Sequence, residues 1–193
     1  MASVAHDLGA DLSLDDPVHA FEAFAEARRD AAVRLAYRLL GGDTAAAEDV
    51  AQNAFLRAFR ALSGFRAEAS VSTWFYRILV HEVRRHQRWQ AVRRLWHLEG
   101  DDAPEPADER PAGDPGLRKR IRDALARLTT AQREAFTLVH MEGYTVAETA
   151  AILGRAPGTV KSHMHRALKS LRQDLADLRL DSRGQEEVRG GPR

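Results

Sequence analysis

A chain of 193 residues with 44% hydrophobic and 30% charged residues can hold one ordinary domain or two small ones. It contains no cysteine, which excludes disulfides and cysteine-ligated zinc as stabilisers of the fold. No apolar run reaches membrane-spanning length and the acidic N-terminus is unlike a signal peptide, so we expect a cytoplasmic protein.

The formal net charge of +1 conceals a strong segregation of charge along the chain. Residues 17–96 carry a net charge of +5 and residues 117–179 one of +6, whereas residues 97–116 between them carry −6. Two basic blocks joined by an acidic connector suggest two modules that face a polyanion. An ordinary solvated helix surface is the alternative interpretation of the same charges.

The first basic block has helical patterns throughout. Three helices are expected, each bounded by a residue that starts or stops a helix: from Pro17 to Gly41 and Gly42, from Asp43 or Thr44 to about Gly64, and from Thr73 to about Arg94. No run of alternating β-branched residues competes with these patterns. The expected fold class is therefore all-α, with two small helical domains.

Residues 97–116, HLEGDDAPEPADERPAGDPG, separate the two domains. This connector has four of the seven prolines, no aromatic residue and one large aliphatic residue, Leu98. Such a segment cannot bury enough apolar surface to offset the entropy lost on ordering, so we expect a flexible, extended linker. Residues 1–16 and 180–193 are likewise expected to be disordered.

Four shorter helices are expected after the connector. They are bounded by two capping boxes, a proline and several stop signals: from Leu117 to Leu128, from Thr129 with Gln132 to Gly143, from Thr145 with Glu148 to Leu153 and Gly154, and from Pro157 to about Leu178.

The last two of these helices form a helix-turn-helix pattern, YTVAETAAILGRAPGTVKSHMHRALKSL. Apolar residues recur at helical spacing in the second helix and predict its buried stripe: Val160, Met164, Ala167, Leu168 and Leu171. The opposite face carries side chains that can hydrogen-bond base edges or phosphates in a major groove: Lys161, Ser162, His165 and Arg166. The pattern favours DNA binding over a plain helical hairpin with a polar outer face.

One segment, HEVRRH, resembles the H-E-x-x-H helix of zinc peptidases. Its two histidines, His81 and His86, are five residues apart, which at about 100° per residue turns them roughly 140° away from each other. Arg84 and Arg85 would also repel a divalent cation. His163 and His165, two residues apart on a helix, diverge as well, so no metal site is expected.

Three blocks together resemble the extracytoplasmic-function (ECF) sigma factors of bacterial RNA polymerase. AEDVAQNAFLRAFRAL is similar to the family's core-polymerase-binding helix, FRAEASVSTWFYRI to its promoter-melting segment, and residues 125–175 to its C-terminal DNA-binding domain. The resemblance extends from about Val18 to Leu178. It implies a region-2-like domain over residues 17–96, for core polymerase and the minus-ten element, and a region-4-like domain over residues 117–179, for the minus-thirty-five element.

The resemblance also implies partners and sites. The partners are the β′ clamp helices and β flap of core polymerase, promoter DNA and an anti-sigma factor, with no cofactor and no enzymatic activity. Core polymerase would bind a face that mixes carboxylates, amides and one exposed leucine: Glu48, Asp49, Gln52, Asn53 and Leu56. Minus-ten recognition and melting, which need aromatic and basic side chains, would use Arg66, Glu68, Ser70, Ser72, Trp74, Tyr76, Arg77, His81, Arg84, Arg85 and Arg88. The minus-thirty-five element would be bound by Arg155, Thr159, Lys161, Ser162, His163, His165 and Arg166.

The chain departs from the family's usual residues at three positions. Family members usually have asparagine at the position of His81, aspartate at that of Arg85 and isoleucine at that of Thr149. The first two departures put in doubt any inherited preference for one minus-ten sequence.

Three other functions remain open from the sequence. A polymerase-independent DNA-binding regulator would not need the face from Glu48 to Leu56 and usually dimerises. A sigma-like decoy that sequesters an anti-sigma factor should lose DNA-facing residues such as Lys161 and Arg166, which this chain keeps. An enzyme is least favoured, because no glycine-rich phosphate loop or nucleophile–base pair stands out.

Overall fold

A computed structural model describes residues 17–65, 69–96 and 115–176, and every regular element in these ranges is a helix. The N-terminal half contains α1 (Pro17–Leu39), α2 (Thr44–Ala61), the short 3₁₀ helix η1 (Leu62–Gly64) and α3 (Val71–Leu95). The C-terminal half contains α4 (Pro115–Arg127), α5 (Thr130–Phe136), the π-helical turn η2 (Thr137–Met141), α6 (Val146–Leu153) and α7 (Pro157–Asp174). The all-α expectation is confirmed.

Some expectations concern residues outside these ranges. They are the disorder of residues 1–16 and 180–193, the flexibility of most of the connector, and the sites at Arg66 and Glu68. No helix among the described residues is long and apolar enough to cross a membrane.

The helix boundaries follow from local chemistry that the sequence already indicates. Asp43 caps α2 by accepting a hydrogen bond from the Ala46 amide over 2.9 Å. Thr129 and Thr145 both form complete capping boxes with the residue three positions later. Gly154 ends α6 in the left-handed region, at φ 64°, where a residue with a Cβ is strained. The last helix ends at Asp174, before the expected Leu178.

The N-terminal half has an aromatic core between α1, α2 and α3. Phe75 of α3 is fully buried and stacks on Phe55 of α2, with ring centroids 4.4 Å apart, while Phe24 of α1 meets it edge-on at 5.4 Å. The side-chain amide of Gln87 on α3 donates to the carbonyl of Leu39 over 3.0 Å and so satisfies the end of α1. These contacts make α3 the central helix of this half.

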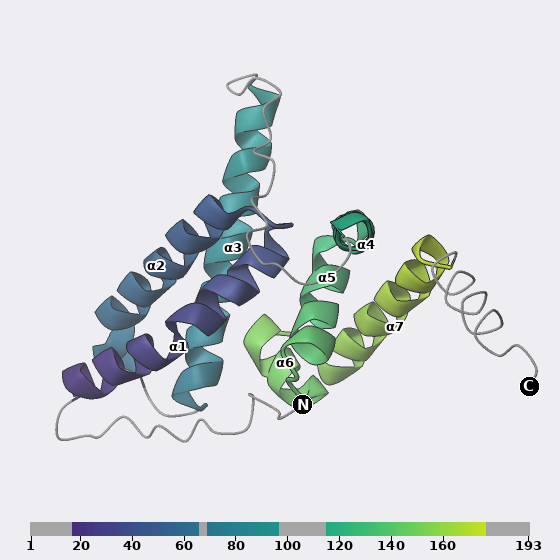
Figure 1. The fold of residues 1–193 in the computed structure, drawn as a ribbon. Helices are drawn as coiled ribbons and strands as arrows, with labels where there is room; N and C mark the ends of the chain where they lie inside the picture. Colours follow the sequence, from purple (N-terminus) through teal and green to yellow (C-terminus); the bar gives the residue numbers. More distant parts are fainter. Residues whose placement is uncertain (1–16, 66–68, 97–114, 177–193) are drawn as a thin grey trace, which may run out of the picture.

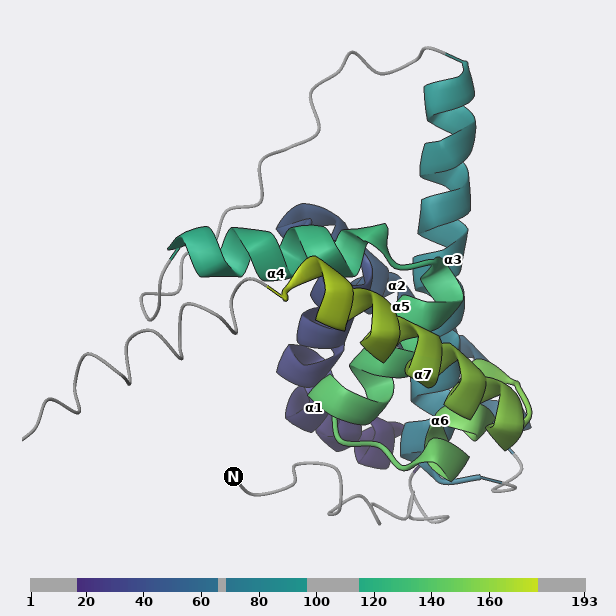
Figure 2. The ribbon, with the colours of Figure 1, turned by 90° about the vertical axis from the view of Figure 1, so that its right-hand side faces the viewer.

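The two halves share one hydrophobic core. The cluster that contains Phe75 continues into η2, α6 and α7 through Leu138, Ile152 and Val160, all nearly or fully buried. Figures 1 and 2 show α5 and α6 beside α1 and α3, and α7 across the outer side of the C-terminal half. A smaller cluster with Leu128 and Leu171 joins α4 to α7. The two helical halves therefore pack against each other through a shared core.

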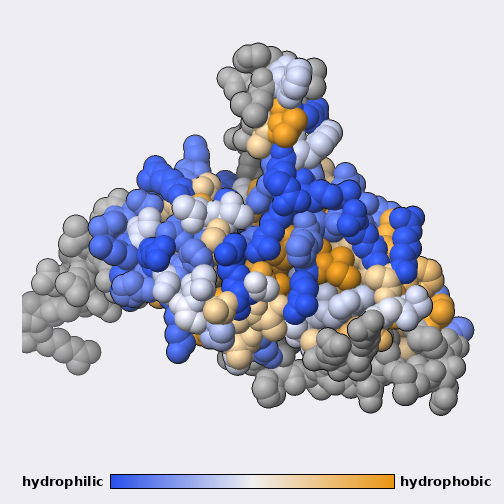
Figure 3. Space-filling model, turned by 180° about the vertical axis from the view of Figure 1, so that it is seen from behind, coloured by the Kyte–Doolittle hydropathy of each residue, from blue (hydrophilic) through white to orange (hydrophobic). Residues whose placement is uncertain are grey.

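The C-terminal end of α3 projects beyond this body (Figure 1). Seen from behind, hydrophilic side chains cover much of the surface and apolar patches are small, one of them near the projecting end of α3 (Figure 3). Three apolar side chains on that end are exposed: Trp89 at 54%, Val92 at 51% and Trp96 at 72%. Such exposure marks a surface suited to a partner.

Candidate protein and nucleic-acid interfaces

The outward face of α2 is exposed to solvent. Its inner face buries Val50, Ala54 and Ala58 in the core. The five residues expected to bind a protein partner are all exposed: Glu48, Asp49, Gln52, Asn53 and Leu56. One turn further on, Phe59 is 48% exposed and extends the apolar part of this face. Phe59 is not among the residues predicted from the sequence. Its spacing of three residues from Leu56 nevertheless indicates that both lie on one helix face.

The composition of this α2 face determines what it can bind. The carboxylates of Glu48 and Asp49 would repel phosphate, whereas carboxylates and amides around Leu56 and Phe59 suit a protein surface with basic groups and an apolar contact. This face therefore has the composition of a protein interface rather than of a DNA-binding surface.

The outward face of α7 presents polar side chains to solvent, of which the Ser162 hydroxyl donates to the Gly158 carbonyl over 3.0 Å. Lys161, Ser162, His165 and Arg166 are exposed, while Val160 and Ala167 on the opposite side are fully buried. Among the other residues expected here, Arg155 is exposed and Thr159 and His163 are half-buried. Burial of one stripe orients the other toward solvent, as a recognition helix requires.

The start of α3 is partly internal. Ser70 caps the helix by accepting the Thr73 amide over 3.1 Å, and Trp74 packs on Phe65 with ring centroids 5.1 Å apart. Ser72 and Tyr76 are buried at 4% and 3% exposure. In this arrangement the two side chains cannot reach DNA.

Three of the residues expected at the minus-ten element contact the C-terminal half. Tyr76 meets Tyr144 edge-on at 5.6 Å, and burial raises the pKa of both phenols. Arg77 donates from Nε and Nη2 to the Ala151 carbonyl over 3.1 and 2.8 Å. Arg84 donates from the same two atoms to both carboxylate oxygens of Glu134.

Comparisons with known proteins assign the two halves. Residues 24–93 match the family description sigma-70 region 2, and residues 118–171 match sigma-70, region 4. The RNA polymerase sigma-E factor of Streptomyces avermitilis is 32% identical over 166 residues, covering 86% of this chain and 90% of the relative. The ECF RNA polymerase sigma factor SigM of Mycobacterium tuberculosis is 37% identical over 145 residues, covering 75% and 71%. The chain belongs to the ECF family of RNA polymerase sigma factors.

Two solved structures have a similar fold. RpoE in complex with the anti-sigma factor NepR from Bartonella quintana gives a TM-score of 0.68 at 27% identity, covering 82% of this chain and 98% of RpoE. CnrH in complex with the cytosolic domain of CnrY gives 0.61 at 26% identity, covering 82% and 89%. The matches do not favour a sigma-like decoy or a polymerase-independent regulator.

In this ECF sigma factor, the HEVRRH segment contains a structural ion-pair cluster. Glu82 is 2% exposed and is bound by Arg57 of α2 over 2.9 Å and by Arg85 over 2.6 Å. His81 is exposed, whereas His86 is half-buried and packs near Trp89. Among the described residues no group of three or more metal-binding side chains occurs. Arg85, one of the family departures, therefore pairs with an acid on its own helix.

The projecting end of α3 adds residues that were not predicted from the sequence. Arg88, which the sequence did predict, is exposed, as a nucleic-acid contact requires. Next to it, the guanidinium of Arg93 lies 4.4 Å from the centroid of the Trp89 ring. Trp89, Val92 and Trp96 are spaced three and four residues apart. This spacing already indicates in the sequence that they lie on one helix face. This sigma factor thus has an aromatic and basic surface beyond the expected minus-ten residues.

Proposed function

We propose that this ECF sigma factor acts in the cytoplasm as a non-catalytic subunit that directs core RNA polymerase to promoters and initiates transcription. One observation carries the proposal. The acidic, amide-rich face of α2 and the donor-rich face of α7 are exposed in the same molecule. A protein partner and a DNA duplex can therefore bind it at once.

Core polymerase would bind the α2 face through Asp49 and Gln52, with Leu56 and Phe59 as the apolar contact. The β′ clamp helices are the expected partner of this face, and the β flap of the region-4-like half. Nearby apolar and polar groups of this kind form the centre and rim of many protein interfaces.

Promoter DNA would bind at two places. The α7 face would read the minus-thirty-five element, with its helix N-terminus in the major groove. Contact with the minus-ten element requires a rearrangement, because Tyr76, Arg77 and Arg84 are engaged by the C-terminal half. We infer that the two halves separate when the protein binds polymerase and promoter.

An anti-sigma factor would act on the equilibrium between packed and separated halves. The solved relatives RpoE and CnrH are complexes with NepR and with the cytosolic domain of CnrY, and this chain has a similar fold while its halves are packed together. A partner with higher affinity for the packed arrangement than for the open one would shift the population toward it.

Run-off transcription with core polymerase on genomic fragments tests the proposal. Specific transcripts should require the sigma factor, and they should disappear in the Asp49→Ala/Gln52→Ala variant while DNA binding by α7 persists. Failure of the wild-type protein to bind core polymerase would overturn it.

A further inference from the structure

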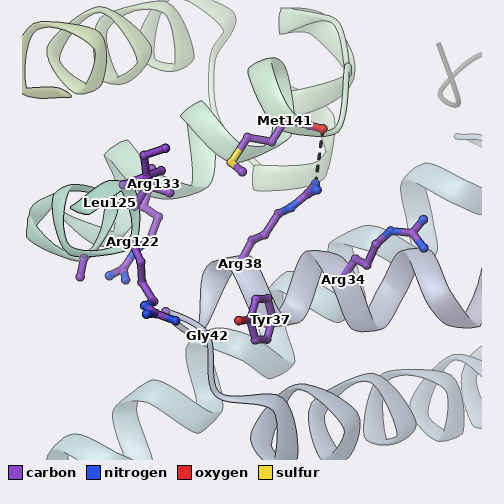
Figure 4. A pocket seen from close by; sticks show the side chains of 11 residues that line it. Arg34, Tyr37, Arg38, Gly42, Arg122, Leu125, Arg133 and Met141 are labelled. Atoms are coloured by element: carbon purple, nitrogen blue, oxygen red, sulfur yellow. Dashed lines mark hydrogen bonds between the residues drawn. The ribbon is translucent and has the colours of Figure 1, made fainter. Parts of the chain in front are cut away.

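A partly open cavity of about 340 Å³ lies between the two halves of the protein. One wall comes from the end of α1 and the turn after it, and the other from α4, α5 and η2. Figure 4 shows Arg38 and Tyr37 on the α1 side and Arg122 and Leu125 on the α4 side. The volume lies within the range of small-molecule sites and is too small for a protein domain or a DNA duplex.

The polar lining of this cavity is cationic. Four arginines line it, Arg34, Arg38, Arg122 and Arg133, and no aspartate or glutamate among the described residues does so. Arg38 is neutralised from outside the cavity by an ion pair with Glu142. The remaining positive charge would attract an anion, because guanidinium groups in a partly desolvated site interact with an anion more strongly than in water.

Arg133 is a partly buried cation of this lining. Burial lowers the pKa of its guanidinium, because the loss of hydration outweighs the opposing effect of the nearby Glu134 charge. The adjacent acid in the chain, Glu134, has both carboxylate oxygens engaged by Arg84. A Cβ placed on Gly41 would lie 3.9 Å from Nη1 of Arg133, so this guanidinium reaches across from α5 to the turn after α1.

The rest of the lining is apolar. Ile121 and Met141 are 39% and 37% exposed, which is high for aliphatic side chains beside a packed core, and Leu125 and Tyr37 lie near them. An apolar surface beside these cations suits a molecule with an anionic group attached to an apolar body.

We propose that this cavity binds a small organic anion with an aliphatic or aromatic body, and that the bound anion holds the two halves together. The second part follows from linkage, because a ligand that needs walls from both halves binds the packed arrangement and not the separated one. In the packed arrangement Tyr76 and Arg84 are covered, so the anion would oppose promoter binding. This regulatory part rests on the proposed function; binding at the cavity does not.

The aromatic sulfonate 8-anilinonaphthalene-1-sulfonate (ANS) is a suitable probe, because its fluorescence rises on binding and it combines an anion with an apolar body. Its uncharged counterpart, N-phenyl-1-naphthylamine, has the same body without the sulfonate. With the whole 193-residue chain, ANS should bind at one saturable site. The Arg122→Gln/Arg133→Gln variant should weaken ANS at least about tenfold, equivalent to ~1.4 kcal/mol, and affect the uncharged probe much less.

Two further variants distinguish the cavity from the exposed aromatic surface of α3 as the place where ANS binds. Ala126→Phe keeps every charge and adds a ring at an exposed lining residue, so it should block both probes. Trp89→Ala/Trp96→Ala removes the exposed aromatic surface of α3 and should leave ANS affinity unchanged. Circular dichroism checks that each variant is folded. ANS affinity that is unchanged in Ala126→Phe, or lost in the tryptophan variant, would overturn the site.

Competition identifies the ligand chemistry. Displacement of ANS by decanoate indicates a carboxylate with an aliphatic body, and displacement by 1-naphthyl phosphate indicates an aromatic phosphate. Either result supports the site.

The linkage is tested by titrating ANS with and without core polymerase. Core polymerase should weaken ANS binding, and ANS should reduce run-off transcription by wild type but not by Ala126→Phe. Equal ANS affinity in both titrations would disprove the regulatory part. A protein that binds ANS at the cavity yet never supports transcription would instead refute the proposed function.

Discussion

Arg84 of α3 and Glu134 of α5 form a two-pronged ion pair, in which Nε and Nη2 each lie 2.7 Å from a carboxylate oxygen. The pair connects the two halves of the protein across 50 residues of sequence. Its hydrogen bonds raise the pKa of the Arg84 guanidinium above its ordinary value. The side chain of Glu134 is only 3% exposed, so Arg84 compensates the burial of its carboxylate.

Arg84→Ala should loosen the contact between the halves, because it leaves a buried carboxylate unpaired. The loss should be about 3–5 kcal/mol, as for one partner of a buried pair. Small-angle X-ray scattering should show a larger radius of gyration. Arg84→Met with Glu134→Leu, which removes both charges, should restore the compact form. An unchanged radius in Arg84→Ala would show that this pair does not hold the halves together.

Asp49→Ala/Gln52→Ala should weaken binding to core polymerase and leave binding to promoter fragments intact, because both residues lie on the exposed face of α2. Leu56→Ala should add to the loss by removing apolar contact area. The matched control is Glu26→Ala, an exposed acid on α1. Surface plasmon resonance with immobilised core polymerase measures the difference. Equal affinities for wild type and the double variant would place the interface elsewhere.

Arg166→Ala should reduce affinity for the minus-thirty-five element by about 1–3 kcal/mol and relax specificity at one base position, since a lost base-edge contact has that effect. Arg172→Ala, an exposed arginine two turns further along α7, is the control and should leave specificity intact. Fluorescence anisotropy with a set of single-base promoter variants provides the readout. Identical base preferences in Arg166→Ala and wild type would contradict the docking of α7.

Arg88→Ala and Arg85→Ala should differ, although the two residues are neighbours on α3. Arg88 is exposed, so its loss should lower the slope of log affinity against log salt by about one. Arg85 binds buried Glu82, so its loss should lower thermal stability, with Arg57 retaining part of the pairing. Filter binding at several salt concentrations and thermal melts distinguish them. A salt slope that changes only in Arg85→Ala would reverse this assignment.

Stability should fall as the pH rises above about 10, because burial raises the pKa of Tyr76 and Tyr144 above the usual 10.0. The unfolded chain then loses phenolic protons that the folded chain keeps. The unfolded state therefore binds fewer protons, and the free energy of unfolding decreases with pH. Urea denaturation between pH 8 and about 11 measures this decrease. Tyr144→Phe should show a shallower decrease, and an identical slope would rule out this cause.

Local patterns in the sequence were enough to predict each α-helix and the outward faces of α2 and α7. Helical spacing places Val50, Ala54 and Ala58 on one side of α2 and Asp49 and Gln52 on the other, and burial confirms the division. Capping residues such as Thr145 act within one turn, so they can be recognised without tertiary information. Periodicity is a property of a single helix, which explains why these predictions succeeded.

The environment of the central part of α3, by contrast, depends on tertiary packing. Aromatic and basic residues there indicated DNA contacts, but the sequence could not show that Tyr76 packs on Tyr144 or that Arg84 pairs with Glu134. Each partner lies 50 or more residues away and on a different element. Which side of α3 is covered depends on how α5 and α6 pack against it, and that packing is set by the shared core, which no local pattern encodes.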